Sequence, residues 1–366
     1  MPSSSKLKSG FTTGSAAAAA AKAATLLLGS KDISDTMDIP LPNQGRLIIP
    51  VHTWCRQDRK IECTVIKDGG DDPDATHQAR ISACVCWEPG EHREVCLQGG
   101  KGVGVVTKPG LPVPVGQAAI NPAPKEQIRN AVLEAMHQSG MTGHIRVRVQ
   151  VADGERIAAK TFNPRLGIVG GISILGTRGT VLPFSHQAYE ETITTCLDAA
   201  RAQGTTDIAL CTGGRSERFL QARYPEMTPE SCVLIADFLA FALEQAAHRG
   251  FERITYACFF GKLVKASQGH AYTHAKTCHI DFDQLADDCV QAGLAASLAL
   301  RIQDCNTARQ ALEIIQDSKV SLHILHRVAA KALHTLAGFA GRKHGLSVHV
   351  FQDDGTLIFN SILQSR

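Results

Sequence analysis

The chain has 366 residues, of which 44% are hydrophobic and 20% charged, and its formal net charge is +3. This balance is that of an ordinary globular protein, and a chain of this length predicts more than one domain. Because the basic residues are scattered rather than clustered, we expect no nucleic-acid partner.

The sequence also predicts a cytoplasmic location. It contains no run of about eighteen apolar residues and no apolar signal region near its start, so we expect neither a membrane span nor secretion. The twelve cysteines lie far apart, without Cys-x-x-Cys pairs, which favours reduced thiols. Cys84 and Cys86 alternate in a strand-like run, and we expect both to be buried.

Residues 1–162 predict a two-layer α+β domain. A helix rich in alanine and leucine begins at Ser15, which can cap it, and ends at Gly29. A second helix is expected over residues 122–139. Short β-rich segments bounded by glycine, proline and aspartate predict strands. These are residues 37–39, 46–52, 61–67, 81–87, 93–97 and 145–151.

Residues 163–300 predict a Rossmann-like α/β domain, because apolar strands here alternate with helices. The expected strands are residues 166–169, 207–211 and 253–259, and the expected helices include residues 186–203, 231–249 and 261–269. Residues 301–366 are expected to form helices and a closing hairpin, whose domain stays unassigned.

The most informative segment is residues 163–183, in which an apolar strand runs into a glycine-dense turn. Glycine removes the Cβ atom where a backbone must approach a bound group, and a following helix can offer free N–H groups. If the turn lies at the edge of the α/β sheet, it lies where such sheets bind ligands. We therefore expect a ligand in this turn.

Two further segments near the start of the chain suit ligand binding. Residues 10–15 place glycines and hydroxyls before a helix, which indicates either capping or an anion site. Residues 67–77 hold four carboxylates and a histidine after a strand. Such a loop could supply a general base, although aspartate-rich turns are often structural, and it lacks the ligand order of a calcium loop.

Three later segments carry polar or glycine-rich patterns. Residues 99–111 are glycine-rich but lack the order of a phosphate loop, so they form either a hairpin or a flat surface for a large ligand. His270 and His274 have helical spacing, but the glutamate of a zinc protease motif is missing. Glu217 is the acid nearest the end of the strand at residues 207–211 and could hold ribose hydroxyls, although it lies several residues late.

As an ordered set, these segments resemble the CbiD family of cobalt-precorrin-5B C1-methyltransferases from anaerobic cobalamin synthesis. The matching stretches are residues 10–22, 67–77, 99–111, 119–122, 160–177, 261–265 and 273–274. The resemblance extends to about residue 276, and the residues after Cys278 match poorly. Ser15 and Ala16 stand where the family usually has threonine and cysteine, so thiol catalysis at position 16 is not expected.

The resemblance implies S-adenosylmethionine as methyl donor and a cobalt-containing tetrapyrrole as acceptor, bound in a cleft between the domains. The cobalt arrives in the substrate, so no protein-bound metal is expected. Asp72 or His77 would accept a proton or orient the ring. The donor would bind at Gly167, Gly170, Gly171, Ser173, Gly176 and Thr177. The substrate's carboxylate arms would bind at Thr12, Thr13, Ser15, Lys101, Lys108, Arg165, Lys262, Lys265 and His274.

Two other functions remain open at this point. A non-catalytic protein that binds and hands over a corrinoid would need the same cationic, glycine-lined surface. An enzyme that uses phosphate could exploit the helix start at residues 10–15. The sequence does not distinguish a monomer from a homo-oligomer.

Overall fold

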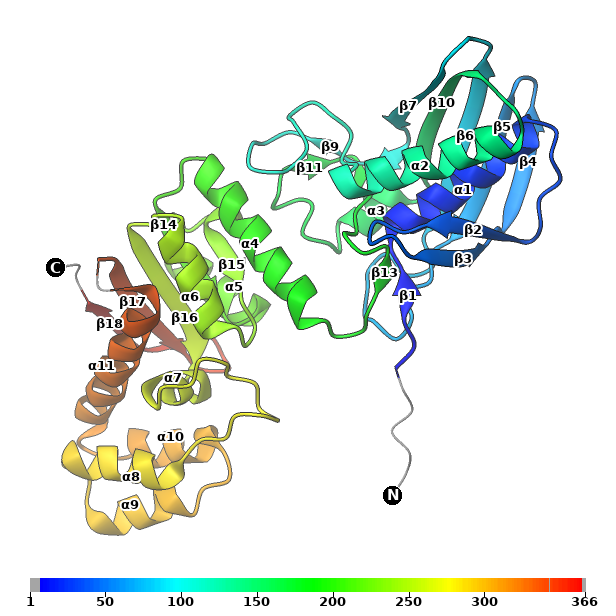
Figure 1. Cartoon of the computed structure of the whole chain (residues 1–366). Coiled ribbons are helices and arrows are strands. Elements are labelled where there is room, and N and C mark those ends of the chain that lie inside the picture. The colour runs from blue at the N-terminus through cyan, green and yellow to red at the C-terminus, as the bar shows by residue number, and fades with distance from the viewer. Residues whose placement is uncertain (1–6, 342, 364–366) are drawn as a thin grey trace, which may run out of the picture. The chain divides into compact units, whose positions relative to one another are not determined.

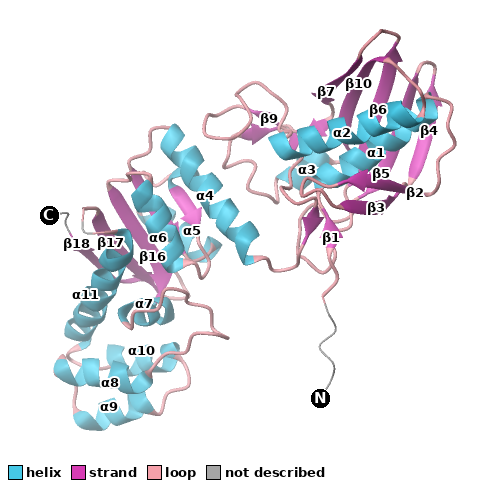
Figure 2. Cartoon of the chain, in the orientation of Figure 1, coloured by secondary structure: helices cyan, strands magenta, loops and turns pink. Residues whose placement is uncertain are grey.

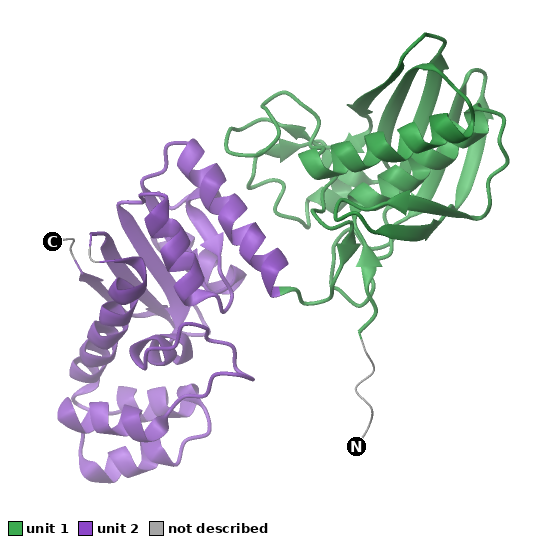
Figure 3. Cartoon of the chain, viewed as in Figure 1, with its two compact units in different colours: residues 1–185 green, residues 186–366 purple. Residues whose placement is uncertain are grey.

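The computed structural model describes residues 7–341 and 343–363 (Figure 1). Contacts divide the chain into two compact units, Met1–Ser185 and His186–Arg366 (Figure 3). The predicted boundary after residue 162 differs from this division, because residues 163–185 pair with strands of the first unit. Among the described residues, no helix is both long and apolar enough to cross a membrane.

The described residues of unit 1 form a five-stranded sheet in the order β4-β5-β6-β10-β7, in which only the β10–β7 pair is parallel. Its strands are β4 (Thr53–Gln57), β5 (Lys60–Ile66), β6 (Arg80–Glu88), β10 (Gly143–Val151) and β7 (Arg93–Gly99). Inward residues alternate with outward ones, as in Gly143–Val151, where the valines and Ile145 are buried. Unit 1 is thus built on a largely antiparallel sheet with one buried face.

Helices α1 (Thr13–Leu28) and α2 (Pro122–Gln138) lie side by side against one face of this sheet (Figure 2). Residues 16–21 are all alanine and are fully buried, because a small side chain lets α1 approach both α2 and the sheet. The opposite face carries the outward side chains, including Cys84 and Cys86. These two cysteines are half-buried there, so the expectation that they are buried is wrong.

Unit 1 also contains several short strand pairs. The hairpin of β2 (Thr36–Pro40) and β3 (Arg46–Pro50) forms a separate two-stranded sheet that contacts α1 and α2. The other pairs bring distant segments together: β1 (Gly10–Phe11) with β13 (Thr180–Val181), β8 (Gly102–Val103) with β12 (Gly171–Ile172), and β9 (Val105–Val106) with β11 (Ile168–Val169). The short helix α3 (Gly154–Ala158) contacts β8 and β12.

The described residues of unit 2 form a sheet in the order β15-β14-β16-β17-β18. Its strands are β14 (Asp207–Cys211), β15 (Cys232–Leu234), β16 (Arg253–Phe259), β17 (Gly345–Phe351) and β18 (Leu357–Leu363). The first four in spatial order are parallel and mainly buried, as expected for strands covered on both faces, while β18 is antiparallel. This unit is therefore a mixed α/β structure.

Helices connect these strands and cover the sheet. They are α4 (His186–Ala202), α5 (Gly214–Arg223), α6 (Leu239–His248), α7 (Phe260–Ser267), α8 (Phe282–Gln291), α9 (Ala296–Gln303), α10 (Ala308–Gln316) and α11 (Ser321–Ala340). A short 3₁₀ turn, Pro229–Ser231, precedes β15. Strands β17 and β18 complete the sheet, and α11 contacts both of them. The segment 301–366, which the sequence left unassigned, therefore belongs to unit 2.

Two predicted elements of this region are wrong. Residues 166–169 are not a strand of the parallel sheet, because Ile168–Val169 pairs with Val105–Val106 inside unit 1. The helix expected over residues 231–249 contains strand β15 and a turn, and α6 begins only at Leu239. The second correction matters for the site, because it places the turn after β15 at an edge of the sheet.

Candidate functional site

The acid-rich loop that follows β5 is held by internal hydrogen bonds. The side chain of Lys67 is buried, and its ammonium lies 2.5 Å from Oδ2 of Asp74. Burial alone would raise the pKa of Asp74, but Lys67 and the hydroxyl and N–H of Thr76 hold that pKa below its ordinary value. This pair therefore anchors the loop rather than facing a substrate.

The remaining carboxylates of the loop tie two other segments to it. Asp68 accepts a hydrogen bond from the ammonium of Lys8 at 2.7 Å, and Asp71 accepts one from the backbone N–H of Lys8 at 2.6 Å. Oδ1 of Asp72 accepts the backbone N–H of Phe184 at 3.0 Å. The loop thus holds both the first described residues and the last residues of unit 1.

His77 lies at the end of the loop with its side chain 42% exposed. Its Nδ1 atom accepts a hydrogen bond from the backbone N–H of Gly69 at 2.9 Å. In the neutral ring the proton is therefore on Nε2, which lies 3.4 Å from the side-chain amide of Gln78. This arrangement suits a residue that orients an acceptor oxygen, because Nδ1 is already engaged by Gly69.

The hydroxyls of Thr12, Thr13 and Ser15 are buried and are used inside unit 1. Thr12 caps α1 by accepting the N–H of Ser15, and Thr13 donates to backbone oxygens of Ser173 and Leu175. The Ser15 hydroxyl donates to the carbonyl of Gly179 at 2.7 Å. The structure therefore contradicts the expected anion site at this helix start, since residues 173–179 cover it.

The glycine-rich turn also differs from its predicted role. It lies in unit 1 and not at the edge of the parallel sheet. A Cβ atom on Gly171 would overlap the carbonyl of Gly102, as would one on Gly154, so these glycines permit chains to cross closely. A Cβ on Gly167 would overlap Lys108, and one on Gly176 would overlap Thr12.

The other predicted donor residues of the turn lie in different environments. Ser173 is buried and donates its hydroxyl to Asn163 at 3.2 Å. Gly170 has φ +82° with open space around it, and Thr177 is exposed. Among the predicted cations nearby, Lys101 is exposed, whereas Lys108 and Arg165 are half-buried. These residues thus differ in burial and in their neighbours, and the structure does not gather them around one binding site.

In unit 2 the carboxyl ends of β14 and β16 lie side by side. The chain leaves β14 through α5 to β15 on one flank, and returns through α6 to β16 on the other. Ligands bind at such reversal points in open α/β sheets. Gly213 and Gly214 follow β14 here, and nothing lies within 4 Å of where a Cβ on either would stand.

A cluster of charged side chains lies at the same edge. Asp237, in the turn after β15, forms an ion pair with Lys262 of α7, and the Lys262 ammonium also donates to the hydroxyl of Thr273 at 2.9 Å. Lys265, one helical turn later, donates to the carbonyl of Thr273 at 2.9 Å. Burial, with the neighbouring charge of Lys262, lowers the pKa of Lys265. Both lysines, expected to bind substrate carboxylates, thus donate to groups of unit 2 itself.

Aromatic rings surround this cluster. Phe238 stacks on Tyr189 with ring centres 5.2 Å apart, and His186 and Tyr272 pack edge-on against it. His274, predicted as a substrate ligand, stacks on Tyr272. Asp237 is the residue that sequence reasoning missed, because the strand before it was interpreted as a helix. Glu217, the acid chosen instead, is buried in the first turn of α5.

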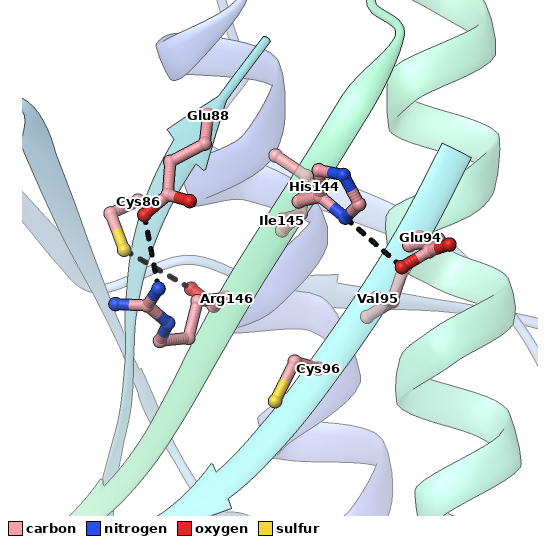
Figure 4. Close-up of a pocket in the computed structure, with 8 residues that line it drawn as sticks. All are labelled: Cys86, Glu88, Glu94, Val95, Cys96, His144, Ile145 and Arg146. Carbon is pink, nitrogen blue, oxygen red and sulfur yellow. Dashed lines mark hydrogen bonds and ion pairs between the residues drawn. The ribbon is translucent and has the colours of Figure 1, made fainter. Parts of the chain in front are cut away.

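Two cavities open on unit 1. One, of about 260 Å³, lies on the sheet face opposite α1 and α2 (Figure 4). Its charges pair with each other, since Arg146 binds Glu88 and His144 binds Glu94, each at 3.0 Å. The other, of about 290 Å³, lies beside His77 and is bordered by Arg80, Arg156 and Lys160. In the part of the chain that the structure describes, no three His, Cys, Asp or Glu side chains converge as metal ligands.

These features define a mixed α/β protein of two units, with a cationic cavity in the first and a polar sheet edge in the second. The family model described as CbiD matches residues 1–183, and the model of the CbiD C-terminal domain matches residues 272–361. The chain belongs to the CbiD family. The second match corrects the expectation that residues after Cys278 do not resemble the family.

Curated relatives agree over most of the chain. A cobalt-precorrin-5B C(1)-methyltransferase of Nitratidesulfovibrio vulgaris is 46% identical over 356 residues, which cover 96% of this chain and 92% of that protein. One from Geobacillus kaustophilus is 43% identical, covering 87% and 85%. A crystal structure of the cobalamin biosynthesis protein CbiD from Archaeoglobus fulgidus has 26% identity and a TM-score of 0.40, covering 70% of this chain and 78% of that one.

Proposed function

We propose that this protein is an S-adenosylmethionine-dependent C-methyltransferase that methylates C1 of cobalt-precorrin-5B to give cobalt-precorrin-6A, in the cytoplasm. The observation that carries the proposal is the 46% identity, over 96% of the chain, to a relative named for this reaction. The cobalt belongs to the substrate, so the protein needs no metal ligands of its own.

The methyl donor would bind at the carboxyl edge of the unit 2 sheet, which we interpret as Rossmann-like. Gly213 and Gly214 leave space there for a ligand to lie against the backbone. Asp237 offers a carboxylate to ribose hydroxyls, as acids after the second strand do in nucleotide-binding sheets. Lys262 and Thr273 hold that carboxylate in place. This site replaces the glycine turn at residues 167–177, where Gly167, Gly171 and Gly176 lie in close contact with other parts of the chain.

Methyl transfer requires positioning more than covalent chemistry from the protein. When bound, the donor supplies an electrophilic methyl group on sulfur. The residues of this chain would have to hold the ring carbon in line with that methyl group. His77 would orient the ring through an acceptor oxygen. Asp72 is the group that would accept the proton released as the ring rearranges.

Isothermal titration and turnover test the function. Saturable binding of S-adenosylmethionine, with addition of one methyl group to cobalt-precorrin-5B seen by mass spectrometry, is the expected result. ATP binding instead would favour an enzyme that uses phosphate. Tetrapyrrole binding with neither donor binding nor turnover would identify a non-catalytic corrinoid-binding protein.

A further inference from the structure

The cavity of about 290 Å³ beside His77 is the feature of unit 1 that the proposed reaction has not yet used. Two segments form its walls. One runs from Ala75 to Arg80 at the start of β6, and the other follows β10 and contains α3. Both segments belong to stretches that resemble the CbiD family, residues 67–77 and 160–177, or directly adjoin them.

Backbone hydrogen bonds hold both walls. In the first wall, Gln78 donates its N–H to the carbonyl of Lys67, and Lys67 donates to Ala79. The second wall is joined to the first where Ala152 donates to the carbonyl of Arg80 at 3.0 Å. Gly154 packs directly on the backbone of Gly102, which fixes the start of α3. The cavity is thus part of the folded frame and not a gap between mobile loops.

Positive charge dominates its lining. Arg80, Arg156 and Lys160 are cations, whereas Asp153 is the single carboxylate among the lining residues. Asp153 lies 3.4 Å from Arg156, in a pair with both side chains exposed, so it offsets one charge weakly. The cavity on the sheet face differs, because Arg146, the one arginine or lysine among its lining residues, pairs with Glu88 there.

We propose that this cavity binds peripheral carboxylate groups of the tetrapyrrole substrate, with Arg80, Arg156 and Lys160 as the binding residues. The inference rests on the proposed function and names a substrate site for it. Planar guanidinium groups bind carboxylates through paired N–H donors, and a lysine adds a point charge. The macrocycle carries several such arms, so a site with an excess of cations gains affinity from each arm it engages.

The test uses the full chain and the octacarboxylate uroporphyrin as a fluorescent probe that needs no methyl donor. The double variant Arg80→Gln/Lys160→Gln removes two exposed cations from the cavity. We expect it to bind uroporphyrin about tenfold more weakly and to show a similar rise in KM for cobalt-precorrin-5B, with kcat unchanged. The salt dependence of binding should also become shallower, because fewer charges take part.

A matched control removes the same charge elsewhere in unit 1. Lys125 and Arg129 are exposed on α2, and Lys125→Gln/Arg129→Gln should leave binding and KM unchanged. Equal weakening in both double variants would mean a general charge effect and would overturn the proposal. If inorganic pyrophosphate displaced uroporphyrin and bound with the same affinity as uroporphyrin, the result would indicate a phosphate site and would also overturn the proposal.

The probe separates this proposal from the proposed function. Weakened uroporphyrin binding in the cavity variant, in a protein that shows no methyl transfer, would leave the cavity site standing and remove the reaction. Methyl transfer by the cavity variant with an unchanged KM for cobalt-precorrin-5B would support the reaction and overturn the cavity site. Absence of uroporphyrin binding to the wild-type protein would overturn the cavity site.

Discussion

The Nδ1 atom of His77 accepts the backbone N–H of Gly69 at 2.9 Å, although eight residues separate them in the sequence. Asparagine can imitate this half of the imidazole, because its side-chain oxygen stands where Nδ1 does. It cannot supply the donor at Nε2. The two functions of this histidine, in holding the loop and in donating outward, can therefore be separated.

We predict that His77→Asn retains wild-type thermal stability, whereas His77→Ala loses about 1 kcal/mol with the hydrogen bond to Gly69. Both variants should lower kcat, by about tenfold to a hundredfold, because both lack the Nε2–H donor. Thermal unfolding and steady-state kinetics check this. Full activity in His77→Asn would show that the histidine serves only the loop.

Glycine substitutions within the turn should have opposite outcomes at neighbouring positions. A Cβ at Gly171 overlaps the backbone of Gly102, so Gly171→Ala should destabilise unit 1 by about 3 kcal/mol or more. At Gly170 nothing lies within 4 Å, and Gly170→Ala should cost about 1 kcal/mol, from its positive φ alone. Urea unfolding measures both. Equal losses would contradict the close crossing seen here.

The donor site predicts a specific effect at Asp237. Asp237→Asn keeps an oxygen for Lys262 and Thr273 but removes the charge offered to ribose hydroxyls, so affinity for S-adenosylhomocysteine should fall about tenfold. Asp207→Asn is the control, because Asp207 pairs with Arg253 at the other end of β14. Isothermal titration that finds Asp237→Asn unchanged would place the donor elsewhere.

The stability of unit 2 should depend on pH through His349. Burial lowers the pKa of this histidine from 6.5 to about 4. In the unfolded chain it takes up a proton at a higher pH, so stability is fully present above about 6.5 and is lost as pH falls toward 4. His349→Gln should flatten this part of the profile, whereas the exposed His323→Gln should not. Urea midpoints at pH 7, 5.5 and 4.5 check it.

Thiol reactivity should follow burial. Cys55 and Cys96 are exposed on unit 1, whereas Cys63 is buried and its pKa is raised to about 12. Iodoacetamide should therefore label Cys55 and Cys96 in the native protein and leave Cys63 unmodified until urea is added. Peptide mass spectrometry gives the pattern. Labelling of Cys63 at the same rate would contradict the described core.

Sequence patterns predicted the elements whose signal is local. The alanine-rich helix is confirmed as Thr13–Leu28, and the strand at residues 145–151 as part of Gly143–Val151. The run that begins at Cys232 was misassigned, because a short apolar strand followed by an apolar helix has no distinct periodicity. Because the sequence predicts a helix there, it does not place Asp237 at the end of a strand, where a ligand-binding acid is expected.

The site was harder to predict than the fold, because its residues depend on distant partners. Glycine permits either a close ligand or a close chain, and the sequence does not distinguish the two. Thr12 and Thr13 precede a helix as an anion site would, yet residues 173–179 occupy that position. Lys262 and Lys265, expected to bind substrate carboxylates, donate instead to Thr273 within unit 2, a partner that their sequence spacing does not reveal.

The pairing of Gly10–Phe11 with Thr180–Val181 closes unit 1 by joining its opening and closing strands. A nascent chain cannot make this contact until nearly half of the protein has left the ribosome. The alanine helix, which packs against α2 and the sheet, keeps its apolar face exposed until the strand that ends at Val151 has been made, and folding of this half should be slow because its contacts are so distant in sequence. Expression should accordingly benefit from chaperones that shield the early segments, and pieces cut before Thr180 should aggregate.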